Sequence, residues 1–271
     1  MDKIDFNQSK QYHLLLRLQR QSEASFYVYS QESPTDGHYE EIGIAKTSPY
    51  VESLKEAVFS NNLLSFNYKN IKIMIVNGLF TLLPAPFATG NTEDKKSFLQ
   101  FNFEDTQNKK TLVDSVAACG LENIFGLPLD TYNFLQRTFP FAEYVHYISP
   151  MLQYFANQKV LGEKGRVYLH VNNTEISVFC FNENRIEVVN TFPCTDTNDA
   201  AYFILNLWER MKFDPLKDGL HIAGLPDRKA ELITVLSRFI ANVVPENDLY
   251  YSKDSILLPF DIQSYLAVNA Q

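Results

Sequence analysis

The sequence has few cysteines and histidines, and neither residue type is spaced to bind a metal. Its three cysteines form no CxxC pair, and its five histidines show neither an HxH nor an i, i+4 spacing, the patterns that gather zinc and similar ions. An odd number of cysteines also argues against a disulfide framework, so we expect buried thiols in a reducing compartment. The sequence therefore predicts a cytoplasmic protein without a structural metal.

Long apolar runs and basic clusters are missing as well. The apolar stretch Ile71–Val76 is interrupted by Lys72, and it is far shorter than the roughly 20 residues that cross a bilayer. The first residues carry no apolar segment, so we expect no signal peptide. With 24 Lys and Arg against 32 Asp and Glu, the formal net charge is −8. We expect no membrane insertion and no nucleic-acid partner, because anionic lipid and phosphate surfaces both select clustered Lys and Arg.

What is present suffices for a large core, since 45% of the 271 residues are hydrophobic and only 21% are charged. The clearest pattern starts at Gly165, where three strand-like segments are separated by the turns Asn172–Thr174 and Asn182–Asn184. This spacing predicts an antiparallel meander. Asp196 is expected to cap a helix that ends before Pro215. The order continues with a strand over Gly219–Gly224, a helix from Asp227 and a strand over Ala241–Val244.

The N-terminal part repeats this β-β-β-α-β-α-β order less regularly. Ser48 and Pro49 are expected to open a helix, Ile71–Val76 is expected to be a buried strand, and Thr89–Lys96 is interpreted as a polar surface loop. The other expected elements are strands over Tyr12–Leu18, Ser25–Ser30, Tyr39–Ala45, Phe80–Pro84 and Tyr144–Ile148, further strands within Val113–Leu127, and helices over Leu129–Phe139 and Pro150–Gln158. We therefore predict two related halves, residues 1–161 and 162–271.

The repeated order, with its second copy beginning near Gly165, resembles the fold of the actin-like ATPases in the ribonuclease H-like superfamily. With the run Leu82-Leu83-Pro84 after a short strand, the whole chain resembles a bacterial family of unknown function placed in that superfamily. The resemblance implies a mixed α/β protein made of two duplicated halves with a cleft between them. It also implies that a ligand would bind in this cleft.

The resemblance places the phosphate-binding turns of active relatives on two segments of this chain. Those relatives carry an Asp-x-Gly pattern, whose Asp organises magnesium-bound water and whose Gly lets backbone amides approach the phosphates. Arg17-Leu18-Gln19 and His170-Val171-Asn172 occupy these positions, so neither turn provides the acid or the glycine. Of the glycine pair that would contact the adenosine, only Gly224 remains. Magnesium-assisted ATP hydrolysis is therefore not expected, because Mg²⁺ requires oxygen ligands.

A small set of side chains is predicted to line the cleft, although each also has an ordinary structural interpretation. The candidates are Arg17, Gln19, His170, Asn172, Asn173, Thr174 and Gly224. Asparagine tolerates a positive φ in a hairpin, and a strand-to-helix turn needs a flexible residue whether or not it binds a ligand. A histidine in a strand is commonly a hydrogen-bonded structural residue. No catalytic residue and no metal ligand is assigned.

The leading hypothesis is a catalytically silent actin-like protein that acts as a cytoplasmic binding or scaffolding module for a protein partner, with no cofactor. One alternative is a nucleotide-binding ATPase or kinase-like enzyme, in which Arg17 and Gln19 face the phosphates of Mg-ATP and Gly224 lies near the base. Another is an assembly component that self-associates. If some of the 21 Phe and 15 Tyr are exposed, they would form a partner-binding patch, since aromatics are enriched at interface cores.

Overall fold

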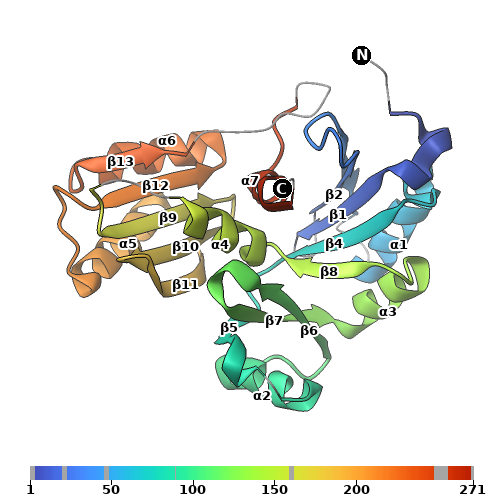
Figure 1. The fold of residues 1–271 in the computed structure, drawn as a ribbon, viewed down its shortest axis with the longest axis horizontal. Coiled ribbons are helices and arrows are strands. Elements are labelled where there is room, and N and C mark those ends of the chain that lie inside the picture. Colours follow the sequence, from blue (N-terminus) through green and yellow to red (C-terminus); the bar gives the residue numbers. More distant parts are fainter. Residues whose placement is uncertain are drawn as a thin grey trace. The chain divides into compact units, whose positions relative to one another are not determined.

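The computed structural model describes residues 4–19, 23–45, 49–88, 90–158, 162–246 and 256–269, and the contacts within it group the chain into two compact units. Unit 1 comprises Met1–Gln153 with Tyr250–Gln271, and unit 2 comprises Tyr154–Leu249. The division predicted from the sequence, 1–161 and 162–271, differs from this grouping mainly in the last segment, which belongs with unit 1. Each unit contains one five-stranded mixed sheet (Figure 1).

In unit 1 the five-stranded sheet has the order β3-β2-β1-β4-β8. The first three strands form an antiparallel meander, β4 pairs in parallel with β1, and β8 pairs in parallel with β4. The strands are β1 (His13–Gln19), β2 (Glu23–Tyr29), β3 (His38–Gly43), β4 (Asn70–Val76) and β8 (Glu143–His146). Leu14–Leu16 are fully buried in the central strand β1, as expected of an apolar run in a strand that is covered on both faces.

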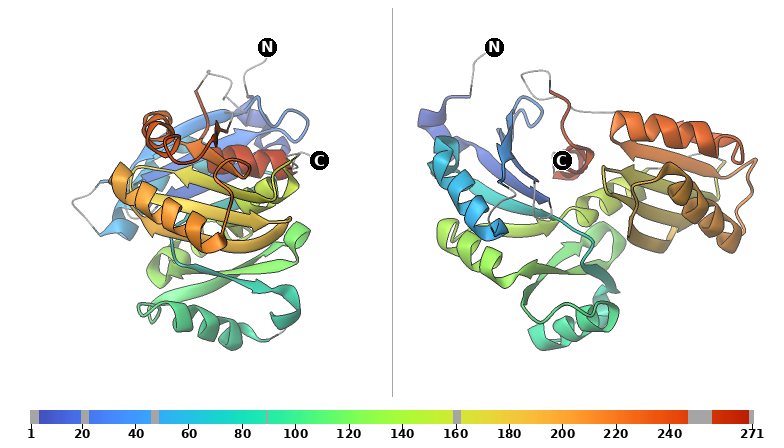
Figure 2. Two further views of the ribbon diagram at one scale, coloured as in Figure 1. Left: turned by 90° about the vertical axis from the view of Figure 1, so that its left-hand side faces the viewer. Right: turned by 180° about the vertical axis from the view of Figure 1, so that it is seen from behind.

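Helices cover both faces of this sheet. α1 (Tyr50–Ser60) and α3 (Leu129–Thr138) contact each other on one face, and α7 (Phe260–Asn269) lies on the opposite face (Figures 1 and 2). The pairings Leu15↔Lys72 and Arg17↔Met74 put Arg17 and Lys72 on the same face, the one that α7 covers. Ser48, the predicted cap of α1, lies outside the described residues.

Between β4 and α3 the chain adds a three-stranded antiparallel sheet of order β5-β7-β6, which α2 contacts. Its elements are β5 (Phe80–Pro84), α2 (Thr92–Asn102), β6 (Lys109–Val116) and β7 (Leu121–Pro128). The predicted polar loop over Thr89–Lys96 is wrong from Thr92 onward, where α2 begins. The Asn91 side chain accepts hydrogen bonds from the backbone N–H groups of Glu93 and Asp94, and Asp94 accepts one from Asn91. This capping box starts a helix.

Unit 2 repeats the topology of the five-stranded sheet, in the order β11-β10-β9-β12-β13. Its elements are β9 (Gly165–Val171), β10 (Glu175–Asn182), β11 (Arg185–Pro193), α5 (Thr197–Met211), β12 (Gly219–Gly224), α6 (Pro226–Leu236) and β13 (Asn242–Pro245). The prediction that Asp196 caps a helix is confirmed, because its side chain accepts hydrogen bonds from the N–H groups of Asn198 and Asp199. Leu169, Ile204 and Leu232 belong to one buried cluster between this sheet and its helices.

The predicted duplication is confirmed, and each copy is followed by one more helix. α4 (Ile148–Asn157) follows β8, and α7 comes after β13 along the chain. The short 3₁₀ helices are η1 (Phe6–Gln11), η3 (Asn62–Ser65), η4 (Ala85–Phe87) and η5 (Ala117–Cys119). Within the described ranges, no helix is both long enough and apolar enough to cross a bilayer.

Candidate functional site

Arg17, the first predicted cleft residue, is buried and forms an ion pair that the sequence pattern did not predict. Its Nε donates to both carboxylate oxygens of Asp261, at 3.0 and 2.8 Å, and its Nη2 lies 2.8 Å from Oδ2 of the same carboxylate. Nη2 also donates to Oε1 of Gln19 at 2.6 Å. Asp261 is fully buried and accepts a further hydrogen bond from the N–H of Ile262. Arg17 and Gln19 are therefore held together, and the guanidinium already has an anionic partner.

The second predicted turn is organised by Asn172. Its side-chain Oδ1 accepts hydrogen bonds from the N–H groups of Thr174 and Glu175 at 3.0 and 2.9 Å, and its own N–H donates to the carbonyl of Glu175. This is an Asx-type turn, which asparagine forms readily. His170 and Asn172 are buried, whereas Asn173 and Thr174 are exposed. The turn thus has a complete structural explanation, and a ligand for it remains a prediction.

Gly224, at the end of β12, needs to be glycine for two reasons. Its φ is +107°, in a region that side chains disfavour. A Cβ at this position would also overlap the backbone carbonyl of Val171 in the neighbouring strand. The chain then turns into α6, and Leu225 donates its N–H to the carbonyl of Val171 at 2.9 Å. Gly224 therefore pairs with Val171 at the end of β9, the residue that lies between His170 and Asn172 in the sequence.

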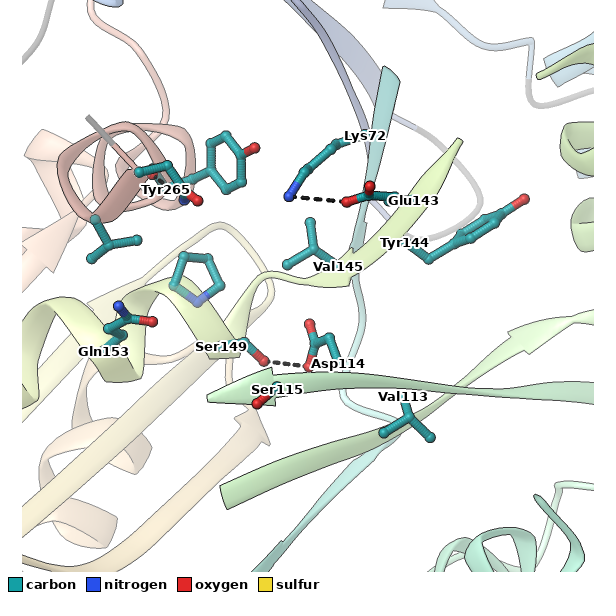
Figure 3. A pocket seen from close by; sticks show the side chains of 13 residues that line it. Lys72, Val113, Asp114, Ser115, Glu143, Tyr144, Val145, Ser149, Gln153 and Tyr265 are labelled. Atoms are coloured by element: carbon teal, nitrogen blue, oxygen red, sulfur yellow. Dashed lines mark hydrogen bonds and ion pairs between the residues drawn. The ribbon is translucent and has the colours of Figure 1, made fainter. Parts of the chain in front are cut away.

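A polar pocket of about 460 Å³ opens within unit 1, between β4, β6, β8, α4 and α7 (Figure 3). The Ser149 hydroxyl donates to Oδ1 of Asp114 at 2.6 Å, and the Asn123 amide donates to that hydroxyl at 2.9 Å. The N–H of His146 donates to Oδ2 of Asp114 at 2.6 Å. Burial raises the pKa of Asp114 to about 7, although the hydrogen bonds from Ser149 and His146 and the charge of Lys72 act in the opposite direction.

Lys72 is the cation of this pocket. Its ammonium lies 3.2 Å from a carboxylate oxygen of Glu143 and 5.8 Å from the centre of the Tyr265 ring. A second, smaller cavity of about 120 Å³ lies against the same lysine and the same tyrosine, and His13 and Tyr29 also line it. The sequence offered one signal for this site, since Lys72 breaks an otherwise apolar strand. Asp114, Glu143, Ser149 and Tyr265 come from separate segments, and no local motif connects them.

The raised pKa of Asp114 predicts a pH dependence of stability. The folded protein keeps this proton up to about pH 7, whereas an unfolded chain releases it near pH 4. Stability is therefore lost as the pH rises between these values. Between pH 5 and pH 8, we expect the free energy of unfolding to fall by about 1–2 kcal/mol less in Asp114→Asn than in the wild type. Urea unfolding at each pH measures this difference.

The matched control is Glu143→Gln. It removes another carboxylate of the same pocket, but the Glu143 side chain is 65% exposed. Its pH dependence should follow that of the wild type. His146 is fully buried, and burial lowers its pKa to about 3. It therefore lowers the stability as the pH falls, and it does so equally in both variants. An unchanged slope in Asp114→Asn would contradict the assignment.

The cysteines and acidic clusters add no further site. Cys119, Cys180 and Cys194 are free. The last two are buried as predicted, but Cys119 is only half-buried. Burial raises the pKa of Cys180 to about 12, which suppresses the reactive thiolate. In the part of the chain that the structure describes, no three His, Cys, Asp or Glu side chains gather as they would around a metal ion.

Comparison with known proteins supports the fold and leaves the activity open. The model of a family described as "Protein of unknown function (DUF3822)" matches residues 1–243. A crystal structure from Bacteroides thetaiotaomicron VPI-5482, described as having an actin-like ATPase fold and unknown function, has 27% identity and a TM-score of 0.83, over 98% of this chain and 99% of that one. The type IV pilus biogenesis complex of PilM and PilN gives 8% identity and a TM-score of 0.53, over 87% and 88%. No curated protein matches the chain. The predicted actin-like fold is thus confirmed.

Proposed function

Because the chain belongs to the DUF3822 family and has an actin-like ATPase fold, we propose that it is a non-catalytic binding or scaffolding module for a protein partner in the cytoplasm. The observation that carries this proposal is the buried pair of Arg17 and Asp261 at the turn that would hold a phosphate. A cation stands where active relatives are expected to have an acid. The carboxylate that reaches this place has both oxygens bonded to Arg17, so it is a poor ligand for Mg²⁺.

The energetics of this pair also disfavour a nucleotide. A phosphate that drew the guanidinium of Arg17 away from Asp261 would break a buried pair, which costs about 3–5 kcal/mol. That cost would weaken nucleotide binding by roughly two to four orders of magnitude, because about 1.4 kcal/mol corresponds to a tenfold change in affinity. Gln19 adds a side chain bonded to the same guanidinium. Residues of this turn therefore stabilise the protein rather than prepare it for phosphoryl transfer.

Exposed aromatic side chains support a role in protein binding. Phe98 and Phe101 are 40% and 90% exposed and lie three positions apart on α2, hence on one side of that helix. Phe87 and Phe141 are 69% and 92% exposed. Exposed apolar side chains that lie together, as Phe98 and Phe101 do, are typical of interaction surfaces. The related fold in the PilM–PilN pilus complex is consistent with such a role.

Isothermal titration of the full chain with Mg-ATP tests the non-catalytic part of the proposal. We expect no binding at micromolar concentrations and no release of phosphate above a buffer control, with an active actin-like ATPase as the positive control of both assays. Micromolar binding with magnesium-dependent hydrolysis would overturn the proposal. It would favour the alternative enzyme, in which Arg17→Ala should then weaken the nucleotide.

A further inference from the structure

The pocket of unit 1 is lined by one cation, Lys72, and by two carboxyl groups, Asp114 and Glu143 (Figure 3). Lys72 extends from β4 and Asp114 from β6, and the side chain of Val145 on β8 lies between them in that view. At about 460 Å³, the pocket has the size of a small-molecule site. Lys72 and Asp114 differ in how well neighbouring side chains neutralise them, and this difference points to the ligand.

The Asp114 carboxylate is firmly oriented, but no described residue forms an ion pair with it. Ser149 and the N–H of His146 each donate one hydrogen bond to it, and an ionised carboxylate can accept about four. The orientation of the carboxylate is also supported indirectly, because the Asn123 amide donates a hydrogen bond to the Ser149 hydroxyl. A half-buried carboxylate with remaining acceptor capacity is a suitable receptor for an ammonium group.

Lys72 has donor capacity that its ion pair with Glu143 does not use. Its side chain is 27% exposed, and its ion-pair partner Glu143 is 65% exposed, so that pair contributes little to stability. An ammonium has three donors, and Glu143 accepts only one of them among the interactions of the described residues. The other N–H groups are available to a carboxylate that enters the pocket.

We propose that this pocket binds a small zwitterion of the free amino acid type, with its ammonium group on Asp114 and its carboxylate on Lys72. A simple amine would pair with Asp114 but meet the like charge of Lys72, and a simple carboxylate would pair with Lys72 but meet Asp114 and Glu143. Only a ligand with both charges complements both sides, and the apolar side chain of Val145, which lines the pocket between Lys72 and Asp114, would contact its carbon atoms. None of these residues belongs to the Arg17–Asp261 pair, so this inference goes beyond the proposed function.

Titration of the full chain with the common L-amino acids at pH 8, where Asp114 is ionised because its pKa is about 7, tests the proposal. The best binder is then compared with its two truncated analogues; for L-leucine these are 3-methylbutylamine and 4-methylpentanoate. We expect the amino acid to bind at least about tenfold more tightly than either analogue. If no amino acid binds, or if the amine or the carboxylate alone binds as tightly, the proposal is wrong.

Variants then assign the contacts. Asp114→Asn and Lys72→Met should each weaken the amino acid by about tenfold or more, whereas the control Glu143→Gln should not weaken it. Asp114→Asn should weaken 3-methylbutylamine as well but bind 4-methylpentanoate at least as tightly as the wild type, because a repelling charge is removed. Lys72→Met should weaken 4-methylpentanoate but not 3-methylbutylamine, and a merely structural role would not produce this pattern. Wild-type affinity in both variants would overturn the assignment. The comparison of the three ligands on the wild-type protein decides the question even if a variant fails to fold.

Discussion

Replacement of Asp261 by alanine should lower the free energy of unfolding by about 3–5 kcal/mol. The carboxylate is fully buried, and Arg17 beside it is only 7% exposed. Removing the acid leaves a guanidinium in the core without an anion, and a buried charge without compensation is costly. The hydrogen bond between Arg17 and Gln19 remains, but a neutral amide cannot replace the lost charge. The substitution would also remove the ion pair that joins α7 to β1, because Asp261 lies on α7 and Arg17 on β1, 244 positions apart in the sequence.

Urea unfolding followed by far-UV circular dichroism measures this effect. Lys96→Ala provides the control, because the pair of Lys96 with Glu93 is 34% and 75% exposed, and it should change stability by at most about 0.5 kcal/mol. The double variant Arg17→Met with Asp261→Leu should recover most of the loss, since apolar residues of similar size often replace a buried ion pair without cost. If Asp261→Ala is as stable as Lys96→Ala, the pair is not the anchor that its geometry indicates.

The repeat of the fold could be predicted from the sequence because its signals are local. Short turns between alternating strands marked the meander after Gly165, and Asp196 marked the start of α5. α2 was missed because its local signals conflict. Leu99 is buried, but Phe98 and Phe101 are exposed, so the helix lacks a single apolar stripe.

α7 was missed for a different reason. Residues Phe260–Leu266 are all buried, including Asp261, Gln263 and Ser264. A helix that is buried on every side has no amphipathic period to detect. Its polar side chains are satisfied locally, as when Gln263 donates to the carbonyl of Leu258 and Ser264 to that of Asp261. Nothing in the segment itself indicates that it belongs with the first unit.

The candidate site depended on contacts that no spacing encodes. Aligning Arg17 with the phosphate turn identified an unusual residue, but its significance comes from Asp261, at the far end of the chain. Asn172 does not have the positive φ that its ordinary interpretation expected, and its side chain forms an Asx-type turn instead. Gly224 does have a positive φ, and it lies close to the neighbouring strand. The pocket around Lys72 draws on three strands and two helices, and only the folded chain brings them together.

Gly224→Ala should destabilise unit 2 by about 3 kcal/mol or more. Two effects add at this position. A non-glycine residue at φ +107° costs about 1–3 kcal/mol in backbone strain. The new Cβ would overlap the backbone of Val171, which cannot move without breaking the pairing of β9 with β12, and overpacking of this kind costs about 1–3 kcal/mol.

Two other glycines separate these effects. Gly162 has φ +93° but no atom within 4 Å of a new Cβ, so Gly162→Ala should show the strain without the overlap and cost about 1–3 kcal/mol at most. Gly43 has neither feature, so Gly43→Ala should stay within about 1 kcal/mol of the wild type. The single tryptophan, Trp208, is buried in α5 of unit 2, so its fluorescence reports the unfolding of the unit that holds Gly224 and Gly162. A Gly224→Ala protein no less stable than Gly162→Ala would show that β9 yields to the new methyl group, and the overlap would then contribute nothing to the need for glycine.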